Sequence, residues 1–328
     1  MKITGHGNND AREWVRGWNS MTEADIHAAA APTPTTPTGT VTHGEQLTRS
    51  LLGPQGTLTQ RAGFTTTAPT VLNGVQINGG VTVNHDFTCT DCRIIGNQGA
   101  GSASYTVKIT SSAGQKFKCV RCEIITRSDV TKGIVSWGNA GIWLERTLVR
   151  GGIDGYFGKP SNGHYTVGGV TYGHVILESM ITDIQRSSGS HSDAIQIDGG
   201  TGGVLVQRSK IESYNIPVGS DPLTTTADGS ELASGGVILT QDSSNPSQIS
   251  KVHLLDNWYD GGNYTVDASP PDGLTPTDVR VENGKWGLKH RFGALRSPHS
   301  VNNRWGATGA TTCHGGTVNV VDESPLSC

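Results

Sequence analysis

The sequence predicts an all-β fold, a parallel β-helix solenoid that follows a short α-helical segment at the N-terminus. Two observations favour this class. Strand-like segments recur at intervals near 30 residues, each with one small polar residue at the same place, and periods of roughly 20–50 residues are typical of solenoids. The 328 residues also include 45 glycines and are only 34% hydrophobic, whereas a conventional globular domain is about 45–50% apolar. A solenoid tolerates so thin a core because each coil packs on its neighbours.

The beginning of the chain differs from the rest. Trp14 and Trp18 lie at helical spacing after a helix-capping aspartate. The following Pro/Thr-rich segment resembles a polyproline-like linker. We therefore expect a helical attachment segment over residues 1–30, a linker over 31–40, and a β-helix domain with a C-terminal cap over 41–328. The two tryptophans are expected either to form a docking face or to pack back on the solenoid as its N-terminal cap.

A ladder of small polar residues runs through the repeats. From Cys92 to Ser209 each step has a length close to that of one repeat, and a much longer step then leads to Asn257. The long step contains a Pro- and Thr-rich insertion, residues 214–236, which we expect to project as a loop. Ladder side chains are expected to point inward or to lie at a corner, where only a compact hydrogen-bonding group fits. The ladder consists of Cys92, Cys122, Thr147, Ser179, Ser209, Asn257 and Asn303.

The six cysteines include two Cys-x-x-Cys pairs, a pattern that often indicates zinc. Their spacing favours another interpretation, because the interval from Cys89 to Cys119 equals the interval from Cys92 to Cys122 and matches one repeat. If one coil takes that length, each cysteine stacks on its counterpart about 4.8 Å away, within reach of a disulfide. We therefore favour stacked thiols or inter-coil disulfides over zinc. The remaining two cysteines, expected to close the C-terminal tail in an oxidising setting, are Cys313 and Cys328.

Several segments resemble the pectate-lyase-like, right-handed parallel β-helix proteins that are widespread in actinobacteria and their phages. The resemblance spans roughly residues 71–310 and is specific for the fold, since the family includes hydrolases, lyases and proteins without assigned chemistry. The segment His191–Asp198 also resembles the Asn-Thr-Asp-Gly-Ile-Asp motif of polygalacturonase-like hydrolases, which implies a catalytic acid at Asp193. Downstream of Asp193 the chain lacks an Asp-Asp pair, Gly-His-Gly and Arg-Ile-Lys, which argues against the polygalacturonase arrangement. The matching segments are Gly152–Gly155, His191–Gln196, Asn257–Val266 and Gly293–Trp305.

The repeat places charged residues in stacked pairs. Aligning the coil of Asp154 with the coil of Asp193 stacks these two carboxyls, and five residues further Lys159 stacks on Asp198. Two carboxyls about 5 Å apart are the acid and the nucleophile of retaining glycosidases, and their repulsion raises the pKa of one of them. The alternative interpretation is structural: a hydrogen-bonded Asp ladder with a salt bridge between Lys159 and Asp198. Lyase chemistry would use the same carboxylates to bind calcium, with a lysine base, so calcium is the one cofactor left open.

Rings and histidines near the loops are candidates for sugar binding, because the CH faces of sugars are apolar and stack on aromatic rings. His191 lies beside Asp193, and His164 is expected to reach over from the preceding coil. Tryptophans at regular positions are expected to stack inside the solenoid; they are Trp258, Trp286 and Trp305. The basic run near the C-terminus, residues 289–299, is expected to be a solvated face or to contact an acidic glycan. The candidate substrate-binding residues are Tyr156, Tyr165, His164, Tyr214 and Tyr264.

Charge and hydropathy exclude several classes of function. The net charge of −3 provides no basic field for nucleic acid. No stretch approaches the roughly 18 apolar residues of a membrane span, and the N-terminus has no apolar segment typical of a secretory signal peptide.

Together with the resemblance, these observations lead us to expect a phage tail-associated protein of the minor tail or tailspike type. It would dock to other tail proteins through residues 1–30 and bind a host cell-surface polysaccharide, with cleavage left open. The family implies a homotrimer located in the virion or outside the cell. The alternative is a secreted polysaccharide hydrolase or lyase of the pectate-lyase-like superfamily.

Overall fold

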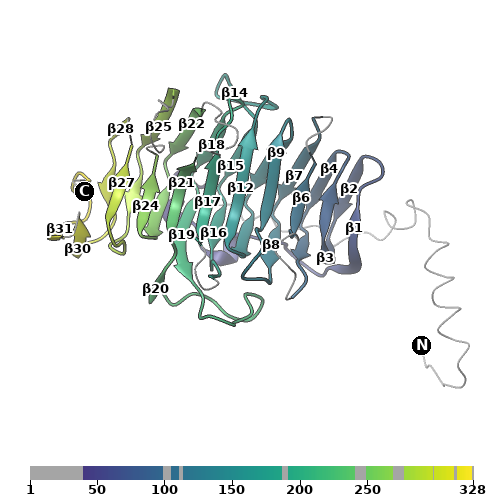
Figure 1. The fold of residues 1–328 in the computed structure, drawn as a ribbon, viewed down its shortest axis with the longest axis horizontal. Helices are drawn as coiled ribbons and strands as arrows, with labels where there is room; N and C mark the ends of the chain where they lie inside the picture. Colours follow the sequence, from purple (N-terminus) through teal and green to yellow (C-terminus); the bar gives the residue numbers. More distant parts are fainter. Residues whose placement is uncertain are drawn as a thin grey trace, which may run out of the picture. The chain divides into compact units, whose positions relative to one another are not determined.

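The computed structural model describes residues 40–98, 105–110, 114–186, 191–240, 249–268, 277–297, 299–313 and 316–326. The chain divides into two compact units, Met1–Thr36 and Pro37–Cys328. The helix expected in residues 1–30 and most of the expected linker lie outside the described residues. In the second unit the strands lie side by side along one axis, in chain order (Figure 1).

The strands form three parallel ladders, and this confirms a parallel β-helix; its right-handed sense stays a prediction. Ladder one contains β2 (Thr70–Asn73), β4 (Phe87–Thr90), β7 (Lys116–Val120), β10 (Gly141–Glu145), β15 (His174–Leu177), β18 (Val204–Gln207), β22 (Ser250–Leu255), β25 (Thr277–Glu282) and β28 (Ser300–Val301). Ladder two contains β5 (Arg93–Ile95), β8 (Glu123–Thr126), β11 (Leu148–Gly151), β16 (Met180–Thr182), β19 (Lys210–Asn215), β23 (Trp258–Gly261), β26 (Lys285–Trp286) and β29 (Arg304–Trp305). Ladder three contains β6 (Val107–Ile109), β9 (Ile134–Gly138), β12 (Asp154–Pro160), β17 (Asp193–Asp198), β21 (Gly235–Thr240), β24 (Tyr264–Asp267) and β27 (Gly293–Arg296).

Ladders two and three meet at the N-terminal end, where β1 (Thr59–Thr65) pairs with the long strand β3 (Val75–Val83). Smaller elements lie outside the ladders. Two of them are antiparallel hairpins, β13 (Tyr165–Val167) with β14 (Val170–Tyr172), and β30 (Gly309–Cys313) with β31 (Gly316–Val320). The short strand β20 (Glu231–Leu232) pairs with the end of β19. It belongs to the insertion predicted over residues 214–236, which extends away from the ladders as expected (Figure 1).

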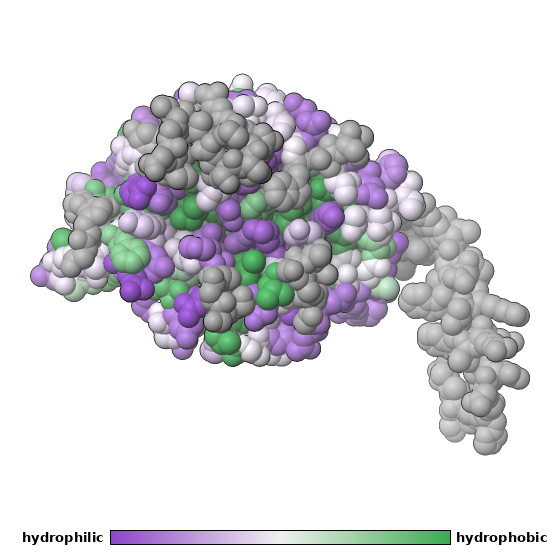
Figure 2. Space-filling model, viewed as in Figure 1, coloured by the Kyte–Doolittle hydropathy of each residue, from purple (hydrophilic) through white to green (hydrophobic). Residues whose placement is uncertain are grey.

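The core consists of inward side chains stacked from coil to coil. In ladder two one such column passes through successive coils in register and ends in three large rings. The column is Ile77, Ile94, Ile124, Val149, Ile181, Ile211, Tyr259, Trp286 and Trp305, all of them fully buried. The stacking predicted for Trp286 and Trp305 is therefore confirmed, whereas Trp258 is only half-buried. On the face shown in Figure 2, hydrophobic side chains appear as small patches among hydrophilic ones.

The predicted polar ladder lies at the corner between ladders one and two. Backbone N–H groups of one coil donate to side chains of the next, from Thr147 to the Ser179 hydroxyl (3.1 Å) and from Ser179 to the Ser209 hydroxyl (3.2 Å). The Ser209 N–H donates to the Asn257 carbonyl oxygen (2.7 Å). All four side chains are fully buried, so this ladder satisfies backbone groups that no water reaches. One further coil, at Gly284, continues it with an N–H that donates to Asn303 (2.8 Å).

Each corner turns at one residue with a positive φ directly before the ladder residue, and most of these residues are charged or amides. Positive φ is uncommon for residues other than glycine, and here the side chains pair along the axis. Arg121 binds Asp91 (2.6 Å), and Glu178 accepts from both Arg146 (2.9 Å) and Arg208 (3.3 Å). The positive-φ residues at this corner include Asp91, Arg121, Arg146, Glu178, Arg208, Asp256, Asn283 and Asn302.

The entry segment before β1 runs back along ladder two. It contains the short 3₁₀ helices η1 (Gly44–Gln46) and η2 (Arg49–Leu51). His43 bonds the carbonyl oxygen of Asn283 (3.0 Å) near the last coils, and Arg49 forms an ion pair with the fully buried Asp183 (2.5 Å) several coils earlier. Leu47 and Leu52 pack against Leu148 and Met180. Residues 40–53 therefore cross several coils on the outside of the solenoid.

Candidate functional site

The two aspartates that the repeat places together lie in register on adjacent coils of ladder three. Asp154 pairs with Asp193, Asp193 with Gly235, and Gly235 with Tyr264. The predicted stacking of Asp154 on Asp193 is confirmed. Both carboxyls are buried, with 2% of Asp154 and 6% of Asp193 exposed. The backbone N–H of Asp193 donates to Asp154 Oδ1 (3.3 Å).

Lys132 completes this column on the side of Asp154. The ammonium group of Lys132 contacts the Asp154 carboxylate and lies 3.8 Å from the centre of the Phe157 ring. It also donates to the Gln196 side chain (3.4 Å). Since Ile134 pairs with Tyr156, Lys132 occupies the position of Asp154 one coil earlier. Asp154 is therefore a carboxylate with a cation on one side and a second carboxyl on the other.

The environment favours different protonation states for the two carboxyls. Burial raises the pKa of Asp193 to about 8, and the neighbouring Asp154 carboxylate adds to this shift. Burial also raises the pKa of Asp154, but Lys132 opposes the shift through its charge and its hydrogen bond. Two titratable groups pushed apart in this way are typical of an acid paired with a base or nucleophile. At neutral pH, a pKa of about 8 leaves Asp193 mostly protonated, while Lys132 favours the ionised form of Asp154 against the effect of burial.

The second predicted pair continues the same strands. Gly158 pairs with Ile197, so Lys159 and Asp198, one residue further on, occupy equivalent positions. Asp198 is buried and accepts from the Thr240 hydroxyl (3.2 Å), which in turn accepts from Gln196 (3.0 Å). Asp198 thus belongs to a hydrogen-bonded chain at the far ends of these strands from Asp193.

An open cleft lies near the start of the strand that carries Asp193. It has a volume of about 360 Å³ and is lined by Arg186, Glu231, Leu232, Ser234, Asn263 and Arg291. Ser234 precedes Gly235, the partner of Asp193, and its N–H donates to the Ser192 carbonyl oxygen (2.7 Å). His191, two residues before Asp193, is exposed. The lining includes neither Asp154 nor Asp193, and the cleft meets the strand of Asp193 through the hydrogen bond between Ser234 and Ser192.

Gly235 lets the Asp193 carboxyl and the Ile238 side chain pack closely against the backbone of the next coil. A Cβ atom at this position would lie 2.8 Å from Asp193 Oδ1 and within 2.4 Å of Ile238 side-chain atoms. Any larger residue would therefore press on the Asp193 carboxyl. On the far side of Gly235, Tyr264 is half-buried beside Phe292, with a ring-to-ring distance of 5.6 Å.

The other predicted sugar-binding residues do not gather at the carboxyl pair. Tyr156 is fully buried, and its hydroxyl bonds His174 inside the solenoid, so it offers no surface to a ligand. His164 and Tyr165 belong to the hairpin segment beside ladder one, where Tyr165 packs on Trp143 at 5.3 Å. Tyr214 is also buried; it hydrogen-bonds Asp260 and lies 5.5 Å from the Lys289 ammonium group. Of the predicted rings, only Tyr264 lies in the column of Asp193.

Two neighbours of the carboxyl pair, Lys132 and Gln196, were not among the predicted site residues, and neither was Arg186 of the cleft. Lys132 was recognisable in principle, because it lies at the same register position as Asp154 in the preceding coil. Gln196 is the third residue after Asp193 and shares a register position with Phe157. Nothing in the local sequence connects Arg186 with Arg291, which the fold brings to one cleft from different coils.

The cysteine clusters show both predicted arrangements. Cys89 and Cys119 form an inter-coil disulfide with a Cα separation of 4.8 Å. Cys92 and Cys122 are buried free thiols that hydrogen-bond to each other. Cys313 is also disulfide-bonded, and its predicted partner Cys328 lies outside the described residues.

Two further properties concern metals and membranes. Within the described ranges, one cluster of three or more histidine, cysteine or acidic side chains is close enough to hold a metal ion, and it consists of Cys89, Cys119 and Cys122. In the same ranges no helix is long and apolar enough to cross a membrane.

Comparisons with known proteins add no relative. The chain matches no protein-family model, no curated protein and no solved structure.

Proposed function

We propose that this protein is a carbohydrate-active β-helix in which Asp154 and Asp193 cleave a glycosidic bond with retention of configuration. The observation that carries the proposal is the pairing of the two carboxyls on adjacent coils, with the pKa of Asp193 raised to about 8. Neighbouring strands lie about 4.8 Å apart. This spacing suits the roughly 5–5.5 Å between the carboxyls of retaining enzymes and not the roughly 6.5–9.5 Å of inverting enzymes.

In this proposal the two carboxyls act in sequence. Asp193 donates its proton to the departing glycosidic oxygen while the Asp154 carboxylate attacks the anomeric carbon and forms an ester. Asp193, now ionised, then removes a proton from water, and the hydroxide breaks the ester and releases Asp154. The ammonium group of Lys132 supports the ionised form of Asp154, which is the form that attacks.

The cleft provides the approach for the sugar chain. Lys132 and Phe157 cover Asp154 from one side, so productive binding requires the flexible Lys132 side chain to turn away from the carboxylate. Tyr264 follows Gly235 in the column of Asp193, and its half-buried ring offers a stacking surface for a neighbouring sugar.

Product analysis tests this proposal. Purified protein is incubated with bacterial cell-envelope polysaccharides, with and without calcium, and reducing ends and unsaturated sugars are measured separately. We expect calcium-independent release of reducing ends that Asp193→Asn abolishes and the matched control Asp278→Asn leaves unchanged, because Asp278 lies on ladder one. Unsaturated products would instead indicate a lyase. Glycan binding without any product would leave the carboxyl pair a structural feature and overturn the catalytic assignment.

We further propose that the glycan is a host cell-surface polysaccharide and that the first unit attaches the solenoid to a phage tail. Support comes from the division of the chain at Thr36 and from disulfides compatible with an extracellular particle. The resemblance adds a homotrimer as the expected assembly. Deletion of residues 1–30 is expected to abolish incorporation into virions while the solenoid stays folded. Incorporation of the truncated protein into virions would refute docking through residues 1–30.

A further inference from the structure

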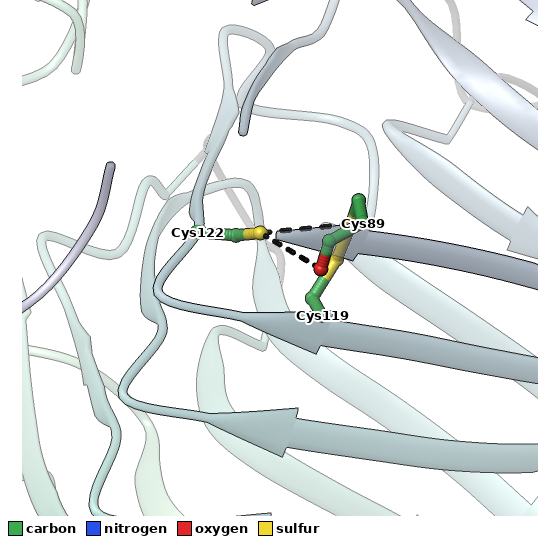
Figure 3. Close-up of side chains that lie close together, drawn as sticks. All are labelled: Cys89, Cys119 and Cys122. Carbon is green, nitrogen blue, oxygen red and sulfur yellow. Dashed lines mark hydrogen bonds between the residues drawn. A yellow bond between two sulfur atoms is a disulfide. The ribbon is translucent and has the colours of Figure 1, made fainter. Parts of the chain in front are cut away.

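Four buried cysteines converge at one corner of the solenoid. Cys89 and Cys92 flank the corner of one coil, and Cys119 and Cys122 flank the same corner of the next. The sulfur atoms of Cys89, Cys119 and Cys122 all lie within 4.8 Å of one another (Figure 3). Cys122 Sγ is 3.6 Å from Cys89 Sγ, and the Cys122 thiol hydrogen-bonds the Cys92 thiol. Three of the four sulfurs therefore form one close group, and Cys92, whose thiol donates to the Thr90 carbonyl oxygen (3.2 Å), lies next to this group at the same corner.

The sulfurs of the two free thiols accept backbone N–H groups. The Val75 N–H donates to Cys92, and the Cys92 N–H donates to Cys122. In later coils the same ladder position uses a hydroxyl or amide oxygen as the acceptor. Hydrogen bonds of this kind orient ligands around bound metals.

We propose that, when the Cys89–Cys119 disulfide is reduced, the four cysteines bind one soft divalent metal ion of the zinc type. Two Cys-x-x-Cys pairs are the ligand set of structural zinc sites. With zinc–sulfur bonds near 2.3 Å, tetrahedral ligand sulfurs lie about 3.8 Å apart, close to the 3.6 Å between Cys122 and Cys89. The ion would enter as the chain folds, because all four cysteines are fully buried in the finished solenoid.

The metal and the disulfide exclude each other. Reduction by a dithiol or a phosphine adds two electrons and two protons and yields the Cys89 and Cys119 thiols. Binding of the dication then displaces four thiol protons and leaves four thiolates. Oxidation in the opposite direction removes two ligands and releases the ion. The same corner would therefore hold a metal in a reducing compartment and a disulfide in an oxidising one.

Cobalt provides the probe. The full chain is unfolded, reduced with a phosphine, and refolded without oxygen in the presence of one equivalent of Co²⁺. We expect one ion per chain, sulfur-to-cobalt charge transfer, and the visible absorption bands of tetrahedral thiolate coordination, all removed by added Zn²⁺. Protein with the Cys89–Cys119 disulfide intact is expected to bind none.

Two serine variants decide the ligand assignment. Cys122→Ser keeps a small hydroxyl at a position where Thr147 and Ser179 serve other coils, and we expect it to lose the four-thiolate spectrum. Cys313→Ser, outside the corner, is expected to retain it. An unchanged spectrum in Cys122→Ser, or no stoichiometric cobalt in the reduced wild-type protein, would overturn the proposal. If Cys122→Ser does not fold, alkylation of the wild-type chain decides: bound Zn²⁺ must protect these four cysteines, and equal labelling with and without zinc refutes the site.

Discussion

Replacing Asp193 by asparagine is expected to stabilise the protein at neutral pH while removing its activity. The side-chain amide resembles the protonated carboxyl in shape but cannot ionise. The pKa of Asp193 rises from 3.8 in a model compound to about 8 in the folded chain. The pKa of Asp193 is higher in the folded chain than in the unfolded chain. Asp193 therefore does not lower the free energy of unfolding below pH ~4, and it lowers it increasingly as the pH rises toward ~8.

The size of the effect follows from the shift. Each pH unit between these two values costs about 1.4 kcal/mol, which amounts to roughly 4 kcal/mol at pH 7 relative to a neutral side chain with the same contacts. We therefore expect Asp193→Asn to raise the free energy of unfolding by about 2–4 kcal/mol at pH 7 and to change it little at pH 4.

Denaturant titrations between pH 4 and pH 9 measure this difference. Intrinsic fluorescence serves as the signal, because Trp286 and Trp305 are fully buried. Asp154→Asn is the comparison: it leaves the Lys132 ammonium group beside a neutral amide in a buried setting, so it is expected to destabilise the fold. A wild-type protein that is as stable as Asp193→Asn at pH 7, or a difference that does not vary with pH, would refute the reasoning.

Three further predictions concern neighbouring residues. Lys132→Met is expected to raise the pKa of Asp154, because the Lys132 charge and hydrogen bond now lower it; the acid limb of the pH–activity profile should move to higher pH, and an unmoved limb would exclude Lys132 from this role. His174 is fully buried, and its pKa is lowered to about 3. The free energy of unfolding should therefore fall by up to several kcal/mol as the pH drops from 6.5 toward 3, because the unfolded chain binds a proton at this histidine before the folded chain does. His174→Asn should flatten this dependence in acid denaturation curves. Ser209→Val removes the acceptor of the buried Ser179 N–H and should cost about 1–3 kcal/mol, whereas Ser209→Thr, which keeps the hydroxyl, should cost less; equal losses in thermal unfolding would contradict the ladder.

The register between coils was predictable because the sequence itself repeats at about the length of one coil. Small polar residues recur at the corner, since only a compact side chain can reach the N–H of the preceding coil. The spacing predicted the pairing of Cys89 with Cys119, and the alignment of the coil of Asp154 with the coil of Asp193 predicted the pairing of these two aspartates; both pairings are confirmed.

The surroundings of the carboxyl pair were less predictable, because they depend on which way side chains point at the turns. Tyr156 lies two residues after Asp154, yet its ring is in the core with His174. Tyr165 comes only a few residues after the end of β12 in ladder three, yet its ring packs beside ladder one. A repeat fixes which residues are vertical neighbours, but it does not reveal which loops return to the same face.

The proposed chemistry depends most directly on the ionisation of the carboxyl pair. Carbon-13 NMR of aspartate-labelled protein, recorded from pH 3 to pH 10 on the wild type, Asp193→Asn and Asp154→Asn, measures it at the atoms concerned. We predict one carboxyl that titrates near pH 8, is missing in Asp193→Asn, and titrates at lower pH in Asp154→Asn because the neighbouring negative charge is gone. Aspartate signals that all titrate below pH 5 in the wild-type protein would contradict an acid held beside a carboxylate, and with it the proposed chemistry.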